Sequence, residues 1–304
     1  MDNGPTTGTP RAPRARRALA LAVMAMLAMA AMLSSAKCYP PGTRVVIFIQ
    51  GIYTTYDANG TQSSLVEQHR FDTLKAEFLA RGYKESALLD FSYAGGTVGA
   101  NGSWHPAPYG CELTDRRPDD NLAPLEKMIA DYRAHHPNAH FTLVGHSLGG
   151  YLAFLEGARE AARAGGDKLA IDVVVTLDAP LSGVSPDKKT ILDIIPCTKT
   201  YLAGGDIVAQ KLDPTTPATR RAQTAEMAAQ GVRLATMGNA YDCFWNPGHC
   251  LPGSWVDDSG TQFLDGEASI SNAYTVPAAP LASHDAILAD ANVVRDTVAF
   301  VGPP

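Results

Sequence analysis

The sequence predicts an α/β fold, in which a mostly parallel sheet of about six strands carries helices on both faces. From Arg44 onward, short apolar segments alternate with longer segments whose apolar residues recur at helical spacing. This alternation is typical of parallel strands joined by crossover helices. The second observation is a glycine-flanked serine in "GHSLG" (145–149), which lies between one such strand and the helix that follows it. The composition, 45% hydrophobic and 18% charged over 304 residues, is that of an ordinary globular protein.

Apolar segments rich in β-branched residues predict buried strands at 44–51, 86–96, 140–145, 169–178 and 231–239. Segments with apolar residues at helical spacing predict helices at 64–83, 121–136, 148–165 and 284–301. Asp120 or Asn121 is expected to cap the second of these helices. The segment 181–230 is longer than a normal crossover, and we expect a cap-like insertion there.

The N-terminus has the order of a secretory signal. A basic stretch, "RAPRARR" (11–17), precedes an uncharged apolar run (18–33) and then small residues. We expect cleavage after residue 36, which leaves residues 37–304 as one domain with its insertion. The alternative is that 18–33 remains as a membrane anchor, because the run is only slightly shorter than the ~20 residues that span a bilayer. The expected location is therefore secreted, periplasmic or at the cell envelope.

Charge and cysteine content limit the function classes. The net charge of −6 argues against a nucleic-acid partner, which requires basic residues to replace phosphate counterions. The five cysteines fit an oxidising compartment. The candidate disulfide pairs are Cys243 with Cys250, across a short turn-rich loop, and Cys111 with Cys197. A metal site with His249 is disfavoured because the spacing matches no zinc pattern. We expect no metal, no cofactor and no protein partner.

Ser147 is the predicted nucleophile. A serine on a sharp turn between a strand and a helix has a strained backbone, and Gly145 and Gly149 remove the β-carbons that would collide there. The alternative of a merely structural turn serine is disfavoured by the flanking elements. An unassisted hydroxyl is a weak nucleophile, so Ser147 needs a general base and an acid that orients the base.

The base and the acid should follow the serine in the chain. His284, at the start of the last predicted helix, is preferred over His249 as the general base. Two aspartates at strand ends are candidates for the acid. Asp242 is preferred and Asp178, in the turn "LDAPLSG", remains the alternative.

Two backbone N–H groups are expected to stabilise the oxyanion that forms when the serine attacks a carbonyl. Leu148 follows the nucleophile at a helix start, where N–H groups are unpaired and the helix dipole favours negative charge. Ile52 lies in the loop after the first strand, where Gly51 allows a close backbone approach. Together these groups form the predicted oxyanion hole.

Four motifs resemble those of the α/β-hydrolase superfamily, in its lipase and esterase branch: "IFIQG", "GHSLGG", "LDAPLSG" and "SHDAIL". The resemblance implies that Ser147 is the nucleophile, His284 the base, and Ile52 with Leu148 the oxyanion hole. Gln50 stands where this branch usually has histidine. An acid after the penultimate strand supports Asp242, whereas an "LDPA"-like turn in some lipases keeps Asp178 open.

The sequence therefore predicts a secreted or envelope-associated serine hydrolase. It is expected to cleave carboxylic esters through an acyl-enzyme on Ser147, with a small-molecule or lipid ester as substrate. A thioesterase or other acyl hydrolase, and a non-catalytic binding protein that has kept the fold, are the alternatives. A dehalogenase is disfavoured because its nucleophile would be an aspartate. Membrane association through the N-terminal segment stays open.

Overall fold

A computed structural model describes residues 44–59, 61–63, 71–181, 216–239, 264, 266–276 and 282–304. Pro41–Pro304 forms one compact unit. The expected signal peptide or anchor within 1–36 lies outside the described residues. In the described ranges, no helix combines the length and apolar character needed to cross a bilayer.

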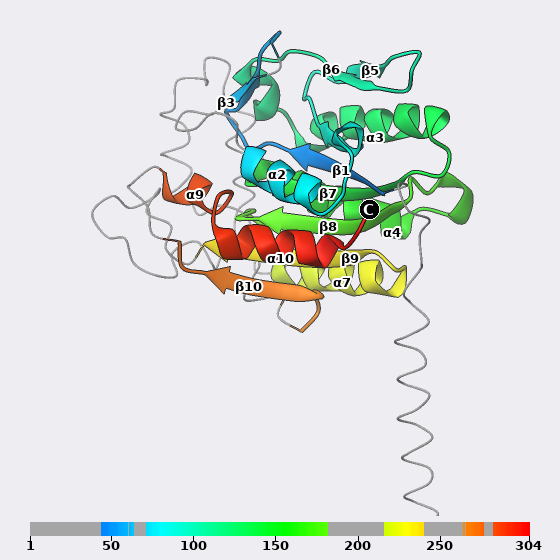
Figure 1. Cartoon of the computed structure of the whole chain (residues 1–304). Coiled ribbons are helices and arrows are strands. Elements are labelled where there is room, and N and C mark those ends of the chain that lie inside the picture. The colour runs from blue at the N-terminus through cyan, green and yellow to red at the C-terminus, as the bar shows by residue number, and fades with distance from the viewer. Residues whose placement is uncertain are drawn as a thin grey trace, which may run out of the picture. The chain divides into compact units, whose positions relative to one another are not determined.

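Within the described ranges, the main sheet has six strands, all parallel, in the order β10-β9-β8-β7-β1-β4 (Figure 1). The strands are β1 (Arg44–Ile49), β4 (Leu88–Asp90), β7 (His140–His146), β8 (Ile171–Leu177), β9 (Arg233–Asn239) and β10 (Ile270–Tyr274). The predicted fold class is confirmed. In a parallel sheet all carboxyl ends lie at one edge, where open α/β sheets place their ligand sites.

Helices cover both faces of this sheet. On one face, Val45, Ile47 and Ile49 of β1 belong to a buried cluster with α3 (Pro118–His135), α4 (Leu148–Ala162) and α7 (Thr216–Ala229). On the other face, Val46 and Phe48 pack with α2 (Asp72–Ala80) and α10 (Ala291–Val301), which lie in front of the sheet in Figure 1. Burial on both faces explains why these strands are continuous apolar runs rather than alternating ones.

Several smaller elements lie outside the main sheet. They are β2 (Thr55–Tyr56) with β3 (Gln62–Ser63), the hairpin β5 (Gly96–Val98) with β6 (Trp104–Pro106), α9 (Ser283–Ala286), and the 3₁₀ turns Glu85–Ala87, Cys111–Asp115 and Gly165–Asp167. The hairpin begins at Gly96, the last residue of the strand expected over 86–96, and Gly96 pairs with Pro106 of β6 rather than with the main sheet.

The structure corrects three element predictions. The strand expected over 86–96 is limited to β4, because a 3₁₀ turn precedes it and Gly95 N donates to Ser92 O (2.8 Å) in a turn after it. Asp120 and Asn121 do not cap α3. This helix begins at Pro118, whose fixed φ suits the first helical position, and it has Arg117 at its N-cap without a side-chain cap.

The helix expected over 284–301 is interrupted. It consists of α9, which ends at Ala286 with Ile287 as its C-cap, and α10, whose N-cap Asp290 accepts from Asn292 N and Val293 N. β10 has no counterpart among the predicted strands. His284 consequently lies on a short helix separate from the long terminal one.

Part of the segment expected to be a cap insertion covers the sheet. Arg220 of α7 donates from Nε to Leu181 O (3.1 Å) and from Nη2 to Tyr151 Oη (3.0 Å), and Met227 is fully buried. The fourteen residues of α7 thus form a crossover helix that leads into β9 and packs against α4. Residues 182–215 lie outside the described residues.

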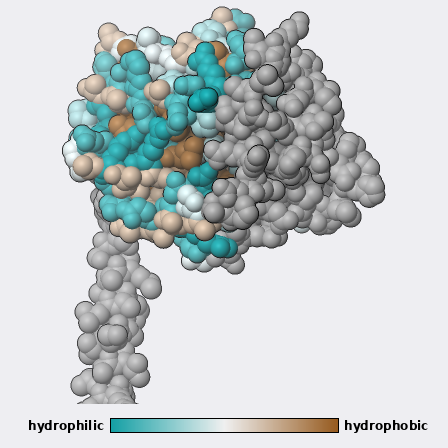
Figure 2. Space-filling model, turned by 180° about the vertical axis from the view of Figure 1, so that it is seen from behind, coloured by the Kyte–Doolittle hydropathy of each residue, from teal (hydrophilic) through white to brown (hydrophobic). Residues whose placement is uncertain are grey.

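Figure 2 shows one face of the molecule. Among the residues coloured there, hydrophilic ones predominate, with smaller hydrophobic areas between them. Among the described residues, Leu79 is the one large hydrophobic side chain that is exposed, at 44%. A single exposed leucine is ordinary for a globular surface and defines no docking patch.

Candidate active site

Ser147 lies on the turn between β7 and α4, and its backbone is strained, with φ 55° and ψ −126°. A non-glycine residue at positive φ outside the usual turn conformations is uncommon and typical of functional sites. The turn is held on both sides, because Ser147 N donates to Leu177 O (2.9 Å) and Tyr151 N donates to Ser147 O (3.1 Å). The serine side chain is presented, half-buried, at the carboxyl edge of the sheet.

The glycines around Ser147 provide steric clearance. A β-carbon on Gly145 would lie 2.2 Å from Gly149 O, and one on Gly149 would lie 2.1 Å from Ile49 O. Gly150, a further glycine in the run, would bring its β-carbon within 2.7 Å of the Ala179 β-carbon. The expected role of the two motif glycines is confirmed, since α4 approaches the ends of β1 and β7 too closely for side chains.

His284 is paired with Asp178. His284 Nδ1 lies 3.0 Å from Asp178 Oδ2, and both side chains are buried. Asp178 follows β8 directly, has a positive φ of 50°, and accepts at Oδ1 from Asn239 N (2.7 Å). Because a carboxylate oxygen accepts, His284 Nδ1 carries the proton in this contact and Nε2 is left as the basic atom.

The structure therefore brings the alternative acid, Asp178, to the predicted base. Asp242, which the sequence favours, and His249, the other candidate base, lie outside the described residues. The strand order explains the contact with Asp178: β8 is the direct neighbour of β7, and Leu177 pairs with His146 in the register.

His146 contacts the backbone of His284, the candidate base. The sequence does not indicate this contact. Its side chain is fully buried, and its Nε2 lies 2.9 Å from His284 O. Since a carbonyl accepts, His146 Nε2 donates this hydrogen bond. The two rings lie with centroids 4.5 Å apart at 43°. His146 thus holds the backbone of the residue that carries the candidate base.

The loop after β1 lies against the serine. A β-carbon on Gly51 would lie 2.9 Å from Ser147 Cβ and 3.4 Å from Ser147 Oγ, so only glycine allows this approach. Ile52 follows at once and is half-buried. On the other side, Leu148 is the first residue of α4, a position whose N–H has no partner within the helix. Both predicted oxyanion donors therefore belong to segments that adjoin Ser147.

The sequence also predicts two disulfide pairs and disfavours a metal site. Cys111 is disulfide-bonded, and Cys38, Cys197, Cys243 and Cys250 lie outside the described residues, so both pairings stay predictions. Within the described ranges, no group of three or more histidine, cysteine, aspartate or glutamate side chains is arranged to hold a metal ion.

Comparison with known proteins gives similarities in structure only. No protein-family model and no curated protein matches the sequence. The product of gene lin2722 from Listeria innocua is 15% identical, with a TM-score of 0.49, over 86% of this chain and 94% of that one. Est1E from Butyrivibrio proteoclasticus is 14% identical, with a TM-score of 0.46, over 86% and 90%.

Phospholipase PlaB from Legionella pneumophila is 13% identical, with a TM-score of 0.41, and the match spans 65% of this chain but only 39% of PlaB. At these identities and scores, the assignment of the fold rests on the chain's own topology. That topology is a six-stranded parallel sheet whose strand β7 leads through a strained serine turn into α4. The chain therefore has the α/β-hydrolase fold.

Proposed function

We propose that this protein is a serine hydrolase that cleaves carboxylic esters through an acyl-enzyme on Ser147. The observation that carries the proposal is the buried contact between His284 Nδ1 and Asp178 Oδ2, 3.0 Å long, at the sheet edge where Ser147 lies. A nucleophile, a base and an orienting acid are the three groups that this chemistry requires. Asp178 takes the role of the acid in this proposal.

In the acylation step, Ser147 Oγ attacks the ester carbonyl carbon while His284 Nε2 takes the hydroxyl proton. Asp178 stabilises the imidazolium and keeps the proton on Nδ1, where the two side chains are in contact. The carbonyl oxygen becomes an oxyanion, which accepts hydrogen bonds from the N–H groups of Leu148 and Ile52. When the tetrahedral intermediate collapses, the alkoxide leaves with the proton from His284, and the acyl group remains on Ser147.

In the deacylation step, a water molecule takes the place of the alcohol. His284 Nε2 accepts a proton from this water as the water oxygen attacks the acyl carbon, and the same proton returns to Ser147 Oγ as the ester bond to the enzyme breaks. The products are a carboxylic acid and the free serine. A thioester would follow the same steps with a thiolate as the leaving group. A comparison of oxygen esters with thioesters as substrates therefore distinguishes an esterase from a thioesterase.

The N-terminal sequence supports a location outside the cytoplasm. The basic stretch 11–17, the apolar run 18–33 and the small residues after it are typical of an exported precursor. We therefore propose a secreted or envelope-associated enzyme. N-terminal sequencing of the protein from the producing cell tests this part: a start at Lys37 supports cleavage, whereas an intact N-terminus in a membrane fraction supports the anchor.

A series of p-nitrophenyl esters of increasing acyl-chain length, with the matching acyl thioesters, tests the activity. The purified full chain is expected to hydrolyse at least one oxygen ester, and Ser147→Ala is expected to lose this activity by several orders of magnitude, as in other triads. The chain length with the highest kcat/KM separates a lipase from a short-chain esterase. Equal rates for the wild type and Ser147→Ala would contradict the proposal.

A further inference from the structure

Buried hydroxyl groups contact the loop after β1 on both sides of Ile52. Tyr93 Oη donates to Gln50 O (2.6 Å), and Thr54 Oγ1 donates to Gly51 O (2.8 Å). Thr114 Oγ1 accepts from Tyr53 N (2.8 Å), and Tyr53 is itself held at a positive φ of 60°. A non-glycine residue at positive φ is strained, and this conformation persists only where the surrounding contacts fix it.

The contact of Thr54 is the most informative of these bonds. Gly51 C=O and Ile52 N–H belong to the same peptide unit, which is planar and trans, so the two groups point in opposite directions. A donor that fixes Gly51 O on one side therefore fixes the direction of the Ile52 N–H on the other. Thr54 is fully buried, which protects this bond from competition with water.

A second hydroxyl orients the first. Tyr109 Oη lies 3.1 Å from Thr54 Oγ1. Because the Thr54 hydroxyl has one hydrogen and gives it to Gly51 O, Tyr109 is the donor in this contact. The direction of the chain is therefore Tyr109 to Thr54 to Gly51. Hydrogen bonds in such a chain polarise and strengthen one another.

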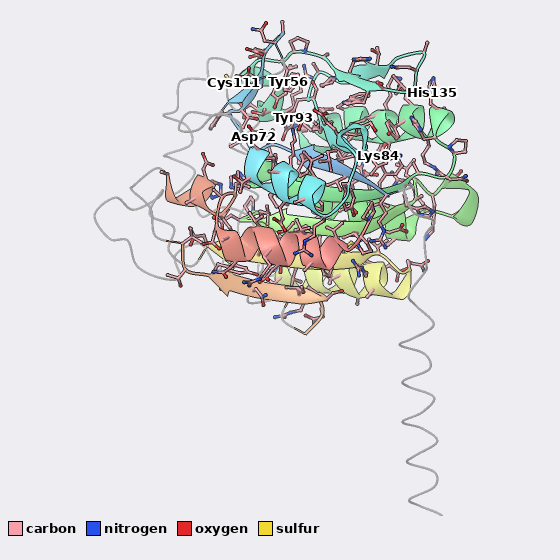
Figure 3. The ribbon with its side chains drawn as sticks, viewed as in Figure 1. Tyr56, Asp72, Lys84, Tyr93, Cys111 and His135 are labelled. Carbon is pink, nitrogen blue, oxygen red and sulfur yellow. The ribbon has the colours of Figure 1, made fainter. Side chains whose placement is uncertain are left out.

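Aromatic packing holds this hydroxyl chain in place. The ring of Tyr109 packs edge-on against Tyr93, with centroids 5.3 Å apart, and is stacked with Tyr56 at 6.4 Å. In Figure 3, Tyr56 and Tyr93 lie to the left of His135, which precedes β7. The tyrosines thus lie at the end of the sheet where β1 leads into the loop.

We propose that Thr54 and Tyr109 are positioning residues that aim the Ile52 N–H at the oxyanion. The inference rests on the proposed ester hydrolysis, because an oxyanion forms only during attack by Ser147. The two side chains contact the loop peptide rather than the substrate. They act by removing reorganisation of the peptide from the reaction, since a donor that is already aimed costs nothing to align in the transition state.

The test compares Thr54→Val, which keeps the shape and removes the hydroxyl, with Thr54→Ser, which keeps the hydroxyl. Thr54→Val is expected to lower kcat about 10- to 100-fold. The upper value is the loss of rate that follows when a catalytic group is misplaced by about 1 Å. KM should stay within about twofold, because the bond acts on the transition state. Thr54→Ser should retain most of the wild-type kcat.

The matched control is Thr224→Val. Thr224 is also buried, and its hydroxyl donates to a backbone carbonyl, that of Arg220 (2.9 Å), but within α7. This variant should lower the melting temperature by a similar amount and leave kcat unchanged. The affinity for an alkylboronic acid, which forms a tetrahedral adduct with the serine, should fall in Thr54→Val by the same factor as kcat/KM.

Tyr109→Phe supplies a second test if Thr54→Val does not fold, with Tyr83→Phe as its control, since Tyr83 Oη donates to Gly302 O (3.0 Å). An active wild type with unchanged kcat in Thr54→Val or Tyr109→Phe would overturn this inference alone. An equal loss of kcat in the control variants would also overturn it. A folded wild type without ester hydrolysis would overturn the proposed function and the inference together.

Discussion

Asp178 follows β8 and is held by contacts from the end of β9 and from α9. Its backbone N–H donates to Met237 O (2.7 Å), its Oδ1 accepts from Asn239 N (2.7 Å), and its Oδ2 faces His284 Nδ1 at 3.0 Å. Asn239 in turn exchanges two hydrogen bonds with Val276, one to its carbonyl and one from its N–H. The carboxylate is therefore fixed in direction, which is what an acid that orients a histidine requires.

Asp178→Asn should lower kcat for ester hydrolysis by about 10⁴-fold, because an amide in place of the carboxylate favours the wrong histidine tautomer. Asp242→Asn is the matched control and should retain kcat within about tenfold. Steady-state kinetics on the best p-nitrophenyl ester give both numbers. If Asp242→Asn loses orders of magnitude and Asp178→Asn does not, the acid is Asp242.

The sequence predicts Ser147 and His284 and favours Asp242 as the acid, whereas the structure brings the alternative, Asp178, to His284. Ser147 is recognisable because its glycine neighbours are dictated locally, by the collisions that β-carbons would cause. The acid depends on which strand end lies beside β7, and this is a property of the sheet order. The same reason explains why the contact from His146 to His284 O, 138 positions along the chain, is not readable from the sequence.

At the scale of the elements, the turn from β7 into α4 is the most constrained part of the fold. Gly149 packs where a β-carbon would meet the carbonyl oxygens of Ile49 and Gln50 at 2.1 and 2.4 Å. These oxygens are backbone atoms at the end of β1 and cannot move away as a side chain would. The turn and the loop after β1 are therefore packed as one unit.

Gly149→Ala should destabilise the protein by about 1–3 kcal/mol, the usual cost of overpacking, and should lower activity by displacing the loop after β1. Gly166→Ala is the control, because a β-carbon there meets nothing within 4 Å. Urea unfolding and ester hydrolysis measure the two effects. Unchanged stability in Gly149→Ala would show that the close approach of α4 to β1 is wrong.

Strands that are buried on both faces are predicted well, because burial determines their apolar sequence. Elements whose boundaries depend on local polar contacts are not predicted. β1, β7 and β8 are continuous apolar runs and appear where expected. β10 is an edge strand with only partly buried or exposed residues, and "ISNAY" has neither a buried run nor a clear alternation. The division between α9 and α10 depends on one aspartate side chain that caps the second helix.

At the scale of the whole molecule, a cluster of ionisable side chains lies at the C-terminal end of α4, the end away from Ser147. Glu156 is fully buried, and its Oε1 accepts from Arg163 Nη2 (2.7 Å). Arg163 also contacts Glu126 and Glu160, and Glu160 accepts from the N–H groups of Leu169 and Ala170. Burial raises the pKa of Glu156 from 4.5 to about 7, against the opposing effect of Arg163.

The raised pKa of Glu156 predicts a loss of stability with rising pH. The folded state binds the proton more tightly than the unfolded state, so the free energy of unfolding falls between about pH 4.5 and pH 7. The fall due to this group is at most about 3 kcal/mol. Urea unfolding at pH 5 and pH 8 should show a smaller difference in Glu156→Gln than in the wild type. Identical differences would contradict the raised pKa.

The central claim, that Ser147 is a nucleophile activated by His284 and Asp178, is tested most directly by a fluorophosphonate probe followed by peptide mapping. The folded full chain is expected to form one adduct, on Ser147, and Ser147→Ala is expected to form none. His284→Ala should react far more slowly, because the hydroxyl then has no base. A folded wild-type protein that forms no adduct, or forms it on another serine, would contradict the account.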